Sequence, residues 1–376
     1  MSDLTYLSGY YGMQNSGDDA LMLATAWGAR KYLGDENFKI SNTTRVNVPG
    51  FGKFEPPLKV VQRFKGENRM RQYHSAIKCD RIIFGGGSVL HNSHDIGIKR
   101  HLIKLAGKDG ALALGIGIGP FRDARAEYVC AEFLKECEYV GVRDQRSFDI
   151  ARSIAPDANV EYTFDLAPLL LLNEDYQSRS IDRSGICVCL CSKERFDGDV
   201  EIEEERVKKI AQSLEYIYKV TGRKITLLDF NGHLTLGDNW IHNKLKQYLP
   251  AEVLEAHILY TENPLEVMQV LETFELVIGM RLHAVILSYL VNTPVISLNY
   301  HQKCSELSNQ IGLASSHQFN TSDIDHKQLT DTIEHSLSME HIMPTLPVTT
   351  AIEMSLKNWR VNSEAADQNI RRYSSV

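Results

Sequence analysis

The 376-residue sequence lacks the marks of several protein classes. No stretch reaches the roughly 18 apolar residues that a membrane-spanning helix needs, and the start, MSDLTYLSGYYG, lacks the basic and apolar segments of a secretory signal peptide. The formal net charge is -7, whereas a general nucleic-acid binder is usually basic. We therefore expect a cytoplasmic protein with no membrane span and no nucleic-acid partner, with peripheral contact at the inner face of the membrane left open.

Paired cysteine motifs are also missing. The seven cysteines form no Cys-x-x-Cys pair and no Cys/His zinc spacing. Cys187, Cys189 and Cys191 alternate in ICVCLC, so they would share one face of a strand, where three thiols could bind a metal or sense redox state. Because free cysteine is so often a buried residue, packing in the core is the better interpretation, and it favours reducing surroundings.

What the sequence does contain is a regular alternation of short apolar runs and helical patterns. Strand candidates lie at 4–9, 81–86, 111–119, 139–142, 186–191, 224–230, 276–279 and 294–299. Helix candidates lie at 18–33, 127–137, 144–154, 202–219, 264–274 and 281–291. Such alternation predicts an α/β fold with parallel sheets covered on both faces. The longest apolar runs, 166–172 and 111–120, fit buried strands or their flanks.

A polar stretch, NEDYQSRSIDRSG, interrupts this alternation near the middle of the chain. We interpret it as a linker and predict an N-terminal domain at 1–174, a C-terminal domain at 185–345 and a helical tail at 346–376 that packs on the first domain. Ligands of parallel α/β sheets bind beyond the carboxyl ends of the strands. The residues that follow each predicted strand are therefore the candidates for a site.

The loop after the first strand, GYYGMQNSGDDA, concentrates polar residues at the start of a helix. Asp18 could simply cap that helix, because carboxylates accept hydrogen bonds from the free amides of a first turn. A cap explains one acid but not Asn15, Gly17, Asp18 and Asp19 together, so a functional loop is favoured.

The next strand end reads GGGSVLHNSHD. Gly86 and Gly87 would let the backbone approach an anion or a sugar, although a tight crossover from strand to helix is the simpler explanation. His91 and His94 have the spacing of a metal pair, but no third ligand is evident, and a hydrogen bond to a polar ligand is favoured.

Further along, Arg143 follows the strand candidate 139–142, and Asp165 follows a short β-like run. An ion pair of Arg143 with Asp144 or Asp149 is an alternative to a functional role.

Two later strand ends carry basic residues without acids. Arg281 and His283 open the helix after 276–279, and Lys303 follows 294–299. The window 276–305 contains no Asp or Glu, although 48 acids in 376 residues predict about four there. Cations beside a helix N-terminus indicate an anion site. The alternative is that these cations pair with acids distant in the sequence.

Together these strand ends resemble the polysaccharide pyruvyltransferase family. The matching pieces, in the family's order, are GYYGMQNSGDDA, GGGSVLH, GIGIGP, VRDQRS, FDLA, GMRLHA and PVISLNYHQK. They span 9–303, and the combination of VRDxxS, MRLHA and a downstream Tyr-x-x-Lys is the most specific part. The family's acidic motif usually reads Asp-Glu where this chain has Asp18-Asp19, which puts a role for Asp19 in doubt.

The resemblance implies two Rossmann-like domains facing a cleft, as in glycosyltransferase-B-like enzymes. It implies transfer of the enolpyruvyl group of phosphoenolpyruvate onto two hydroxyls of a cell-surface or exopolysaccharide sugar, free or lipid-linked, with a pyruvate ketal and phosphate as products. No metal and no cofactor are expected. The implied residues fall into three sets: His283, Asp18 and Arg143 for catalysis; Arg143, Arg281, His283 and Lys303 for phosphoenolpyruvate; and Asn15, Asp18, Gly86, Gly87, His91 and Asp165 for the acceptor.

Two other functions stay open at this point. One is a glycosyltransferase or epimerase that uses a nucleotide sugar, although such enzymes often read the donor's ribose with a Glu where this chain has its acid-free window. The other is a non-catalytic protein that binds a sugar or an anion. The sequence leaves the acceptor sugar and the oligomeric state open.

Overall fold

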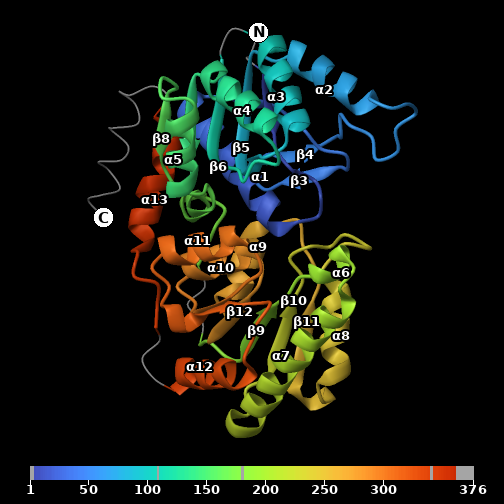
Figure 1. The fold of residues 1–376 in the computed structure, drawn as a ribbon, viewed down its shortest axis with the longest axis vertical. Helices are drawn as coiled ribbons and strands as arrows, with labels where there is room; N and C mark the ends of the chain where they lie inside the picture. Colours follow the sequence, from blue (N-terminus) through green and yellow to red (C-terminus); the bar gives the residue numbers. More distant parts are fainter. Residues whose placement is uncertain (1–3, 108–109, 179–181, 339–341, 361–376) are drawn as a thin grey trace. The chain divides into compact units, whose positions relative to one another are not determined.

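The computed structural model describes residues 4–107, 110–178, 182–338 and 342–360 (Figure 1). The chain divides into two compact units. Unit 1 comprises Met1–Met13, Asp18–Tyr176 and Thr349–Val376, and unit 2 comprises Gln14–Gly17 and Gln177–Val348. The short segment Gln14–Gly17 therefore groups with unit 2, although the residues on either side of it group with unit 1.

Unit 1 is built on a parallel sheet of six strands. Its order is β2-β1-β5-β6-β7-β8, and every pair along it is parallel. The strands span β1 Leu4–Ser8, β2 Asn37–Ile40, β5 Arg81–Leu90, β6 Ala111–Ile118, β7 Tyr139–Val142 and β8 Val160–Tyr162. The strand order reverses direction between β1 and β5. In open α/β sheets such a switch point is where ligands bind.

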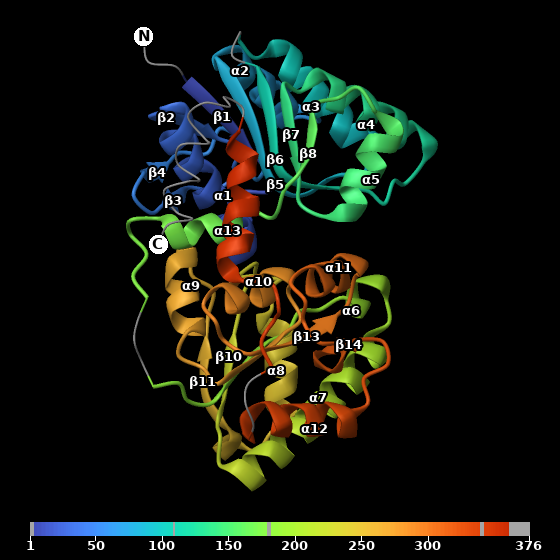
Figure 2. The same ribbon diagram turned by 90° about the vertical axis from the view of Figure 1, so that its left-hand side faces the viewer.

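Helices cover both faces of this sheet. Figure 2 shows α3, α4 and α5 on one side and α1 and α13 on the other. Their bounds are α1 Ser16–Gly28, α2 Glu67–Ile77, α3 Ser93–Leu105, α4 Ala124–Glu136, α5 Gln145–Ile154 and α13 Val348–Leu356. A small antiparallel hairpin, β3 Val46–Val48 with β4 Gly52–Phe54, follows β2. The central strands β6 and β7 are wholly buried, as their continuous apolar runs require.

The segment after α13 is anchored in unit 1 by a buried asparagine. Asn358 accepts hydrogen bonds from the backbone N–H of Gly115 at 2.7 Å and from the hydroxyl of Thr163, and its amide donates to the carbonyl of Phe164. Trp359 lies against Gly28, where a Cβ would come within 2.1 Å of its ring. Positions 361–376 of the predicted tail lie outside the described residues.

Unit 2 repeats the plan with a different strand order, β11-β10-β9-β12-β13-β14. Its strands span β9 Ile186–Cys189, β10 Ile225–Leu228, β11 Leu254–Ile258, β12 Leu276–Gly279, β13 Val295–Asn299 and β14 Gln318–Asn320. Counted within the unit this is the 3-2-1-4-5-6 order of a Rossmann fold. The helices used below are α7 Val200–Thr221, α8 Asn239–Tyr248, α9 Pro264–Leu271, α10 Leu282–Leu290, α11 Gln302–Gln310 and α12 His326–Ser338. The switch point lies between β9 and β12.

The structure decides between two interpretations of the apolar run 166–172. Residues Ala167–Leu172 form a 3₁₀ helix that follows a strand instead of a strand themselves, with Pro168 in its first turn. Proline has no N–H for a sheet ladder, and its fixed φ suits the start of a helical turn. The prediction for the cysteines is confirmed, since all seven are free and buried, and burial raises the pKa of Cys191 to about 12.

Candidate functional site

Arg143 lies at the carboxyl end of β7 in unit 1 and is almost fully buried, with 7% of its surface exposed. Its Nη1 donates to Oδ2 of Asp165 at 3.3 Å, and its Nη2 donates to the hydroxyl of Ser88 at 2.8 Å. Its Nε lies 3.7 Å from Oδ2 of Asp144. Gly117 on β6 makes room for the guanidinium, because a Cβ there would stand 3.3 Å from Nε. Two of the predicted residues, Arg143 and Asp165, are thus brought together.

The glycines of β5 have a packing role that the sequence did not reveal. The strand continues through Gly85–Gly87 to Leu90, with φ of 71° at Gly86 and 84° at Gly87. A Cβ at Gly86 would come within 2.8 Å of Leu21 on α1. Close approach of α1 therefore explains Gly86, whereas Gly87 has only Val89 nearby, at 3.7 Å.

The histidines after β5 do not gather as metal ligands. His91 and His94 belong to no cluster of three potential ligands within the described residues. Asn92 caps α3 by accepting the N–H groups of His94 and Asp95. His91 is half-buried, and its carbonyl accepts a hydrogen bond from the N–H of Arg122. His94 is exposed in the first turn of α3.

The predicted functional loop, GYYGMQNSGDDA, is held at Gln14 and Ser16 by backbone contacts to the loop after β10. Within unit 2, the N–H of Ser16 donates to the carbonyl of Phe230 at 2.8 Å, and Gln14 accepts from the N–H of Gly232 at 2.8 Å. Gln14 has φ 55°, the left-handed region that non-glycine residues rarely adopt. Such strain persists where surrounding contacts impose it, and it is often found at functional sites.

Gly17 in this loop packs directly on His283. A Cβ at Gly17 would lie 2.3 Å from Nδ1 of the histidine, so only glycine fits. Asn15 shapes the same turn by accepting the N–H of Gly17 at 3.0 Å. The predicted residues Asn15, Gly17 and His283 are therefore together in unit 2.

Asp18 and Asp19 occupy the first turn of α1 in unit 1, where the helix dipole favours carboxylates. Asp19 is buried, with 2% exposed, and Asp18 is half-buried. Burial raises the pKa of Tyr10, and the carboxylates of Asp95 and Asp18 raise it further. The Asp18 carboxylate thus acts electrostatically on Tyr10, the second residue after β1.

Arg281 precedes α10 at the switch point of unit 2 and pairs with a distant acid. Its Nε lies 3.1 Å from each oxygen of Asp238, and its Nη2 also donates to Asp238. Asp238 is fully buried and accepts the N–H groups of Phe230 and Asn231 at 3.0 and 2.9 Å. Burial lowers the pKa of Arg281, but the Asp238 carboxylate raises it above its ordinary value. Arg281 therefore pairs with an acid distant in the sequence, which was the alternative to an anion site.

His283 and Lys303 begin the helices that follow β12 and β13. His283 is half-buried in the first turn of α10, and Lys303 is half-buried in the first turn of α11. The N–H of Lys303 donates to Nδ1 of His301, which caps α11. Neither of these fully described helices has an acid in its first turn.

A model of one protein family, polysaccharide pyruvyl transferase, matches residues 15–302, which is more than half of the chain. The chain belongs to this family. The match includes Arg143, Arg281 and His283, and it ends one residue before Lys303. The family predicted from the strand ends is therefore confirmed.

Several solved structures are similar to this chain, and they are glycosyltransferase-B-like enzymes. The UDP-GlcNAc 2-epimerase of Methanocaldococcus jannaschii superposes with a TM-score of 0.60 at 14% identity, covering 99% of each chain. Staphylococcus aureus MnaA with UDP gives 0.63 at 10% identity, covering 98% of each. The Neisseria meningitidis UDP-GlcNAc 2-epimerase gives 0.59 at 11%, covering 96% of this chain and all of its own. At these identities the likeness establishes the glycosyltransferase-B-like fold.

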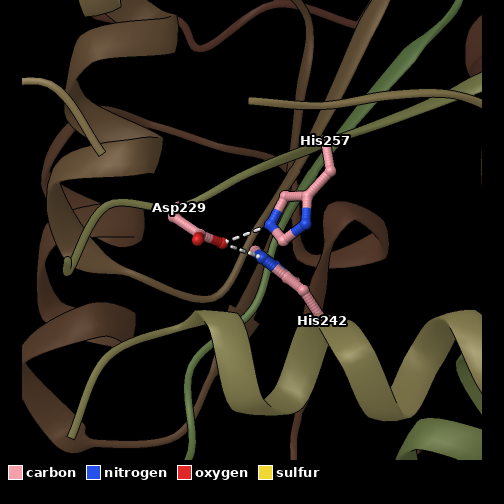
Figure 3. Close-up of side chains that lie close together, drawn as sticks. All are labelled: Asp229, His242 and His257. Atoms are coloured by element: carbon pink, nitrogen blue, oxygen red, sulfur yellow. Dashed lines mark hydrogen bonds and ion pairs between the residues drawn. The ribbon is translucent and has the colours of Figure 1, made fainter. Parts of the chain in front are cut away.

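The structure also shows a buried network in unit 2 that sequence reasoning missed. Oδ1 of Asp229, just after β10, accepts from Nδ1 of His242 at 2.5 Å and from Nε2 of His257 at 2.7 Å (Figure 3). The outer ring nitrogens are also engaged, because Leu190 N–H donates to His242 Nε2 and Lys246 Nζ lies 2.6 Å from His257 Nδ1. Burial raises the pKa of Asp229, but the hydrogen bonds from the two histidines outweigh it and lower this pKa to about 2.

These three side chains are spaced like metal ligands, but their hydrogen bonds do not fit a metal. His242 Nε2 accepts a backbone N–H, so the ring proton must sit on Nδ1, the atom that would have to ligate. The network is therefore a hydrogen-bonded support for the end of β10. Asp229 lies in the predicted strand 224–230, but His242 and His257 come from α8 and β11, and no spacing in the sequence links them.

One further result concerns the membrane: among the described residues, no helix is both long enough and apolar enough to cross one.

Proposed function

We propose that this chain transfers the enolpyruvyl group of phosphoenolpyruvate to two hydroxyls of a saccharide, forming a pyruvate ketal and releasing phosphate. Two C–O bonds form at carbon 2, the bond from carbon 2 to the phosphate oxygen breaks, and carbon 3 gains one proton. The two hydroxyl protons that are released supply carbon 3 and the leaving phosphate. The proposal includes a cytoplasmic site of action on a free or lipid-linked precursor of a cell-surface polysaccharide.

The observation that carries the proposal is where the basic residues lie. Arg143, Arg281, His283 and Lys303 each follow the carboxyl end of a strand and stand at the N-terminus of a helix. A cation there opposes the helix dipole by about 0.3–1 kcal/mol, so helix stability does not explain Arg143, His283 and Lys303. A donor with a carboxylate and a phosphate does, because anions are favoured at helix N-termini and by cations.

Each residue then has a proposed role. Arg143 and Lys303 hold the charged groups of phosphoenolpyruvate, and His283 donates a proton to carbon 3 or to the leaving phosphate. Asp18 removes a proton from the attacking hydroxyl. The bidentate pair with Asp238 favours a bracing role for Arg281, which fixes the turn that leads into His283.

We assign donor binding to the predicted domain at 185–345, with Arg143 as a further donor-binding residue, and acceptor binding to the predicted domain at 1–174. Asn15, Gly86, Gly87, His91 and Asp165 stay proposals for the acceptor. The basic residues neutralise phosphate in this scheme, so neither a metal nor another cofactor is required.

The test is to incubate the full chain with phosphoenolpyruvate and a panel of glycans and to measure phosphate. Acceptor-dependent phosphate release with a ketal in the product supports the proposal. Release of uridine diphosphate from a nucleotide sugar, without phosphate from phosphoenolpyruvate, would point to a glycosyltransferase or an epimerase and reject it. Binding of phosphoenolpyruvate without any turnover would indicate a non-catalytic protein.

A further inference from the structure

Unit 1 contains a cavity of about 210 Å³ at the carboxyl edge of its sheet. Its walls are formed by Ser8 at the end of β1, Gly9 and Tyr10 after it, Asn42 after β2 and Val89 near the end of β5, and α3 closes one side. It therefore lies at the point where the strand order reverses, between β1 and β5, which is the expected place for a ligand in such a sheet. Its size is on the scale of one sugar ring.

A buried amide in this cavity has an oxygen with no partner. Asn42 is fully buried and donates from its amide nitrogen to the carbonyl of Thr44. Its Oδ1 has no hydrogen-bond donor among the described residues. A buried polar atom without a partner is costly, and native structures rarely keep one unless a ligand or water completes it.

Two opposite charges of α3 also line the cavity without pairing directly. Across the described part of the chain, neither the carboxylate of Asp95 nor the ammonium of Lys99 makes an ion pair or a side-chain hydrogen bond. Burial lowers the pKa of Lys99, and Asp95 acts in the opposite direction. A carboxylate, an ammonium and an amide oxygen around one small space can together accept from and donate to several hydroxyls.

The cavity also has an apolar wall. Tyr10, whose surface is 43% exposed, lies beside Leu58, Val89 and Ile98 among the lining residues. Burial raises the pKa of Tyr10, and the carboxylate of Asp95, which also lines the cavity, raises it further. An aromatic face beside convergent polar groups suits a sugar, which has an apolar ring face and hydroxyls around it.

We propose that this cavity binds one neutral sugar residue of the acceptor, with Asp95, Lys99 and Asn42 contacting its hydroxyls and Tyr10 covering its ring face. None of these residues was singled out from the sequence. The assignment of this sugar as the acceptor rests on the proposed function, whereas sugar binding by the cavity does not.

The direct test is binding by the full chain without phosphoenolpyruvate, measured by saturation-transfer NMR. The probes are the methyl glycosides of glucose, galactose and mannose. We expect at least one of them to bind the unaltered chain and to bind about tenfold more weakly or not at all after Asp95→Asn or Lys99→Met, because each change removes a charged hydrogen-bonding group. Lys104→Met is the matched control: this lysine lies on the same helix, pairs with Glu136 and does not line the cavity, so binding should be unchanged.

Two outcomes would overturn the inference: no binding of any probe by the unaltered chain, or equal binding by the unaltered chain, Asp95→Asn and Lys99→Met. Kinetics separate this inference from the proposed function. If phosphate release requires a glycan but the KM for that glycan is unchanged in both variants, the cavity assignment fails and the function stands. If a probe binds through Asp95 and Lys99 but phosphoenolpyruvate yields no phosphate with any glycan, the function fails and the cavity stands.

Discussion

Arg143 in unit 1 and Arg281 in unit 2 both follow a strand, precede a helix and pair with a buried aspartate, yet the two pairs are built differently. Asp238 faces Nε of Arg281 with both oxygens and also accepts two backbone N–H groups of the loop after β10. Arg143 divides its guanidinium between Asp165, Ser88 and Asp144, three residues of three separate segments.

The difference gives the two arginines different roles. Arg281 stabilises the loop and the helix around it, whereas Arg143 is oriented at the end of a sheet. A bidentate pair uses the planar fork of a guanidinium on the partner aspartate, so Arg281 stabilises the loop and the start of α10. Arg143 is oriented by single contacts to elements around the sheet edge, which is compatible with the donor-binding role proposed for it. Mutation of Arg143 should therefore mainly reduce transfer activity, whereas mutation of the Arg281–Asp238 pair should mainly reduce the free energy of unfolding.

The largest effect should come from the residues proposed to act on the donor. We expect His283→Ala to lower kcat by about 10²–10⁴, because it removes a proton donor, and Arg143→Ala to lower it by about 10²–10³, because it removes charge stabilisation of the reacting group. Phosphate release under saturating substrates measures both. Arg152→Ala is the control, since this arginine is exposed and has no proposed role.

Arg143→Ala also leaves Asp165 buried without its cation, so a fold defect must be separated from a chemical one. Adding Asp165→Asn removes the uncompensated charge. The double variant should recover much of the lost free energy of unfolding and none of the transfer. Recovery of transfer in the double variant would show that Arg143 serves only to neutralise Asp165.

Mutation of the Arg281–Asp238 pair in unit 2 should mainly affect folding stability. Asp238→Ala leaves Arg281 buried without its anion and frees two backbone N–H groups, so we expect the free energy of unfolding to fall by about 3–5 kcal/mol in urea denaturation. Arg281→Met combined with Asp238→Asn should regain part of that loss. If Arg281→Met alone unfolds like the unaltered chain but no longer binds phosphoenolpyruvate, then Arg281 is a ligand group and the contrast with Arg143 is wrong.

Much of this architecture could be predicted from periodicity. The strands 139–142 and 276–279 have the predicted bounds, and α10 differs from its prediction by one residue at each end. Strand ends in a parallel fold converge on one edge, so naming the residues after each strand found Arg143 and Asp165 without knowledge of their pairing. Apolar runs buried on both faces give the strongest signal, because nothing but a core explains them.

What the sequence could not show was contacts between distant segments. Asp238 lies 43 positions from Arg281, in a loop whose composition is ordinary for a turn. The cavity residues Asn42 and Lys99 carry no motif, and the short strands β2, β11 and β14 lie outside the predicted set. Strands of three to five residues at the edges of a sheet have weak patterns, and tertiary pairing decides whether they form.

A smaller effect is expected for Lys303, which has a proposed role in donor binding alone. Lys303→Ala should raise the KM for phosphoenolpyruvate about 10- to 100-fold, the usual worth of a hydrogen bond to a charged group, with kcat changed much less. Steady-state kinetics with varied phosphoenolpyruvate measure this. Lys303→Arg, which keeps the charge, should restore part of the affinity. An unchanged KM in Lys303→Ala would remove this residue from the donor site.

The smallest effect is expected for the network around Asp229, in which the carboxylate pairs with two histidines instead of an arginine. The folded pKa of Asp229 is lowered to about 2 from 3.8, so its contribution to stability is present above pH 4 and is lost as the pH falls toward 2. This shift corresponds to up to about 2 kcal/mol. Asp229→Asn should therefore reduce the free energy of unfolding at pH 6 by that order and flatten its fall between pH 4 and pH 2.

The substitution isolates the charge, because both histidines donate to the same oxygen, Oδ1, and an asparagine oxygen in its place can accept both hydrogen bonds. The measurement is urea denaturation at a series of pH values, and the quantity of interest is the difference between the two proteins. If the difference stays constant from pH 6 to pH 2, the carboxylate's charge adds nothing and the network is held by its hydrogen bonds. A difference that shrinks toward pH 2 identifies Asp229 as a titrating support for the loop that carries Phe230 and Gly232, and through them for Gln14–Gly17.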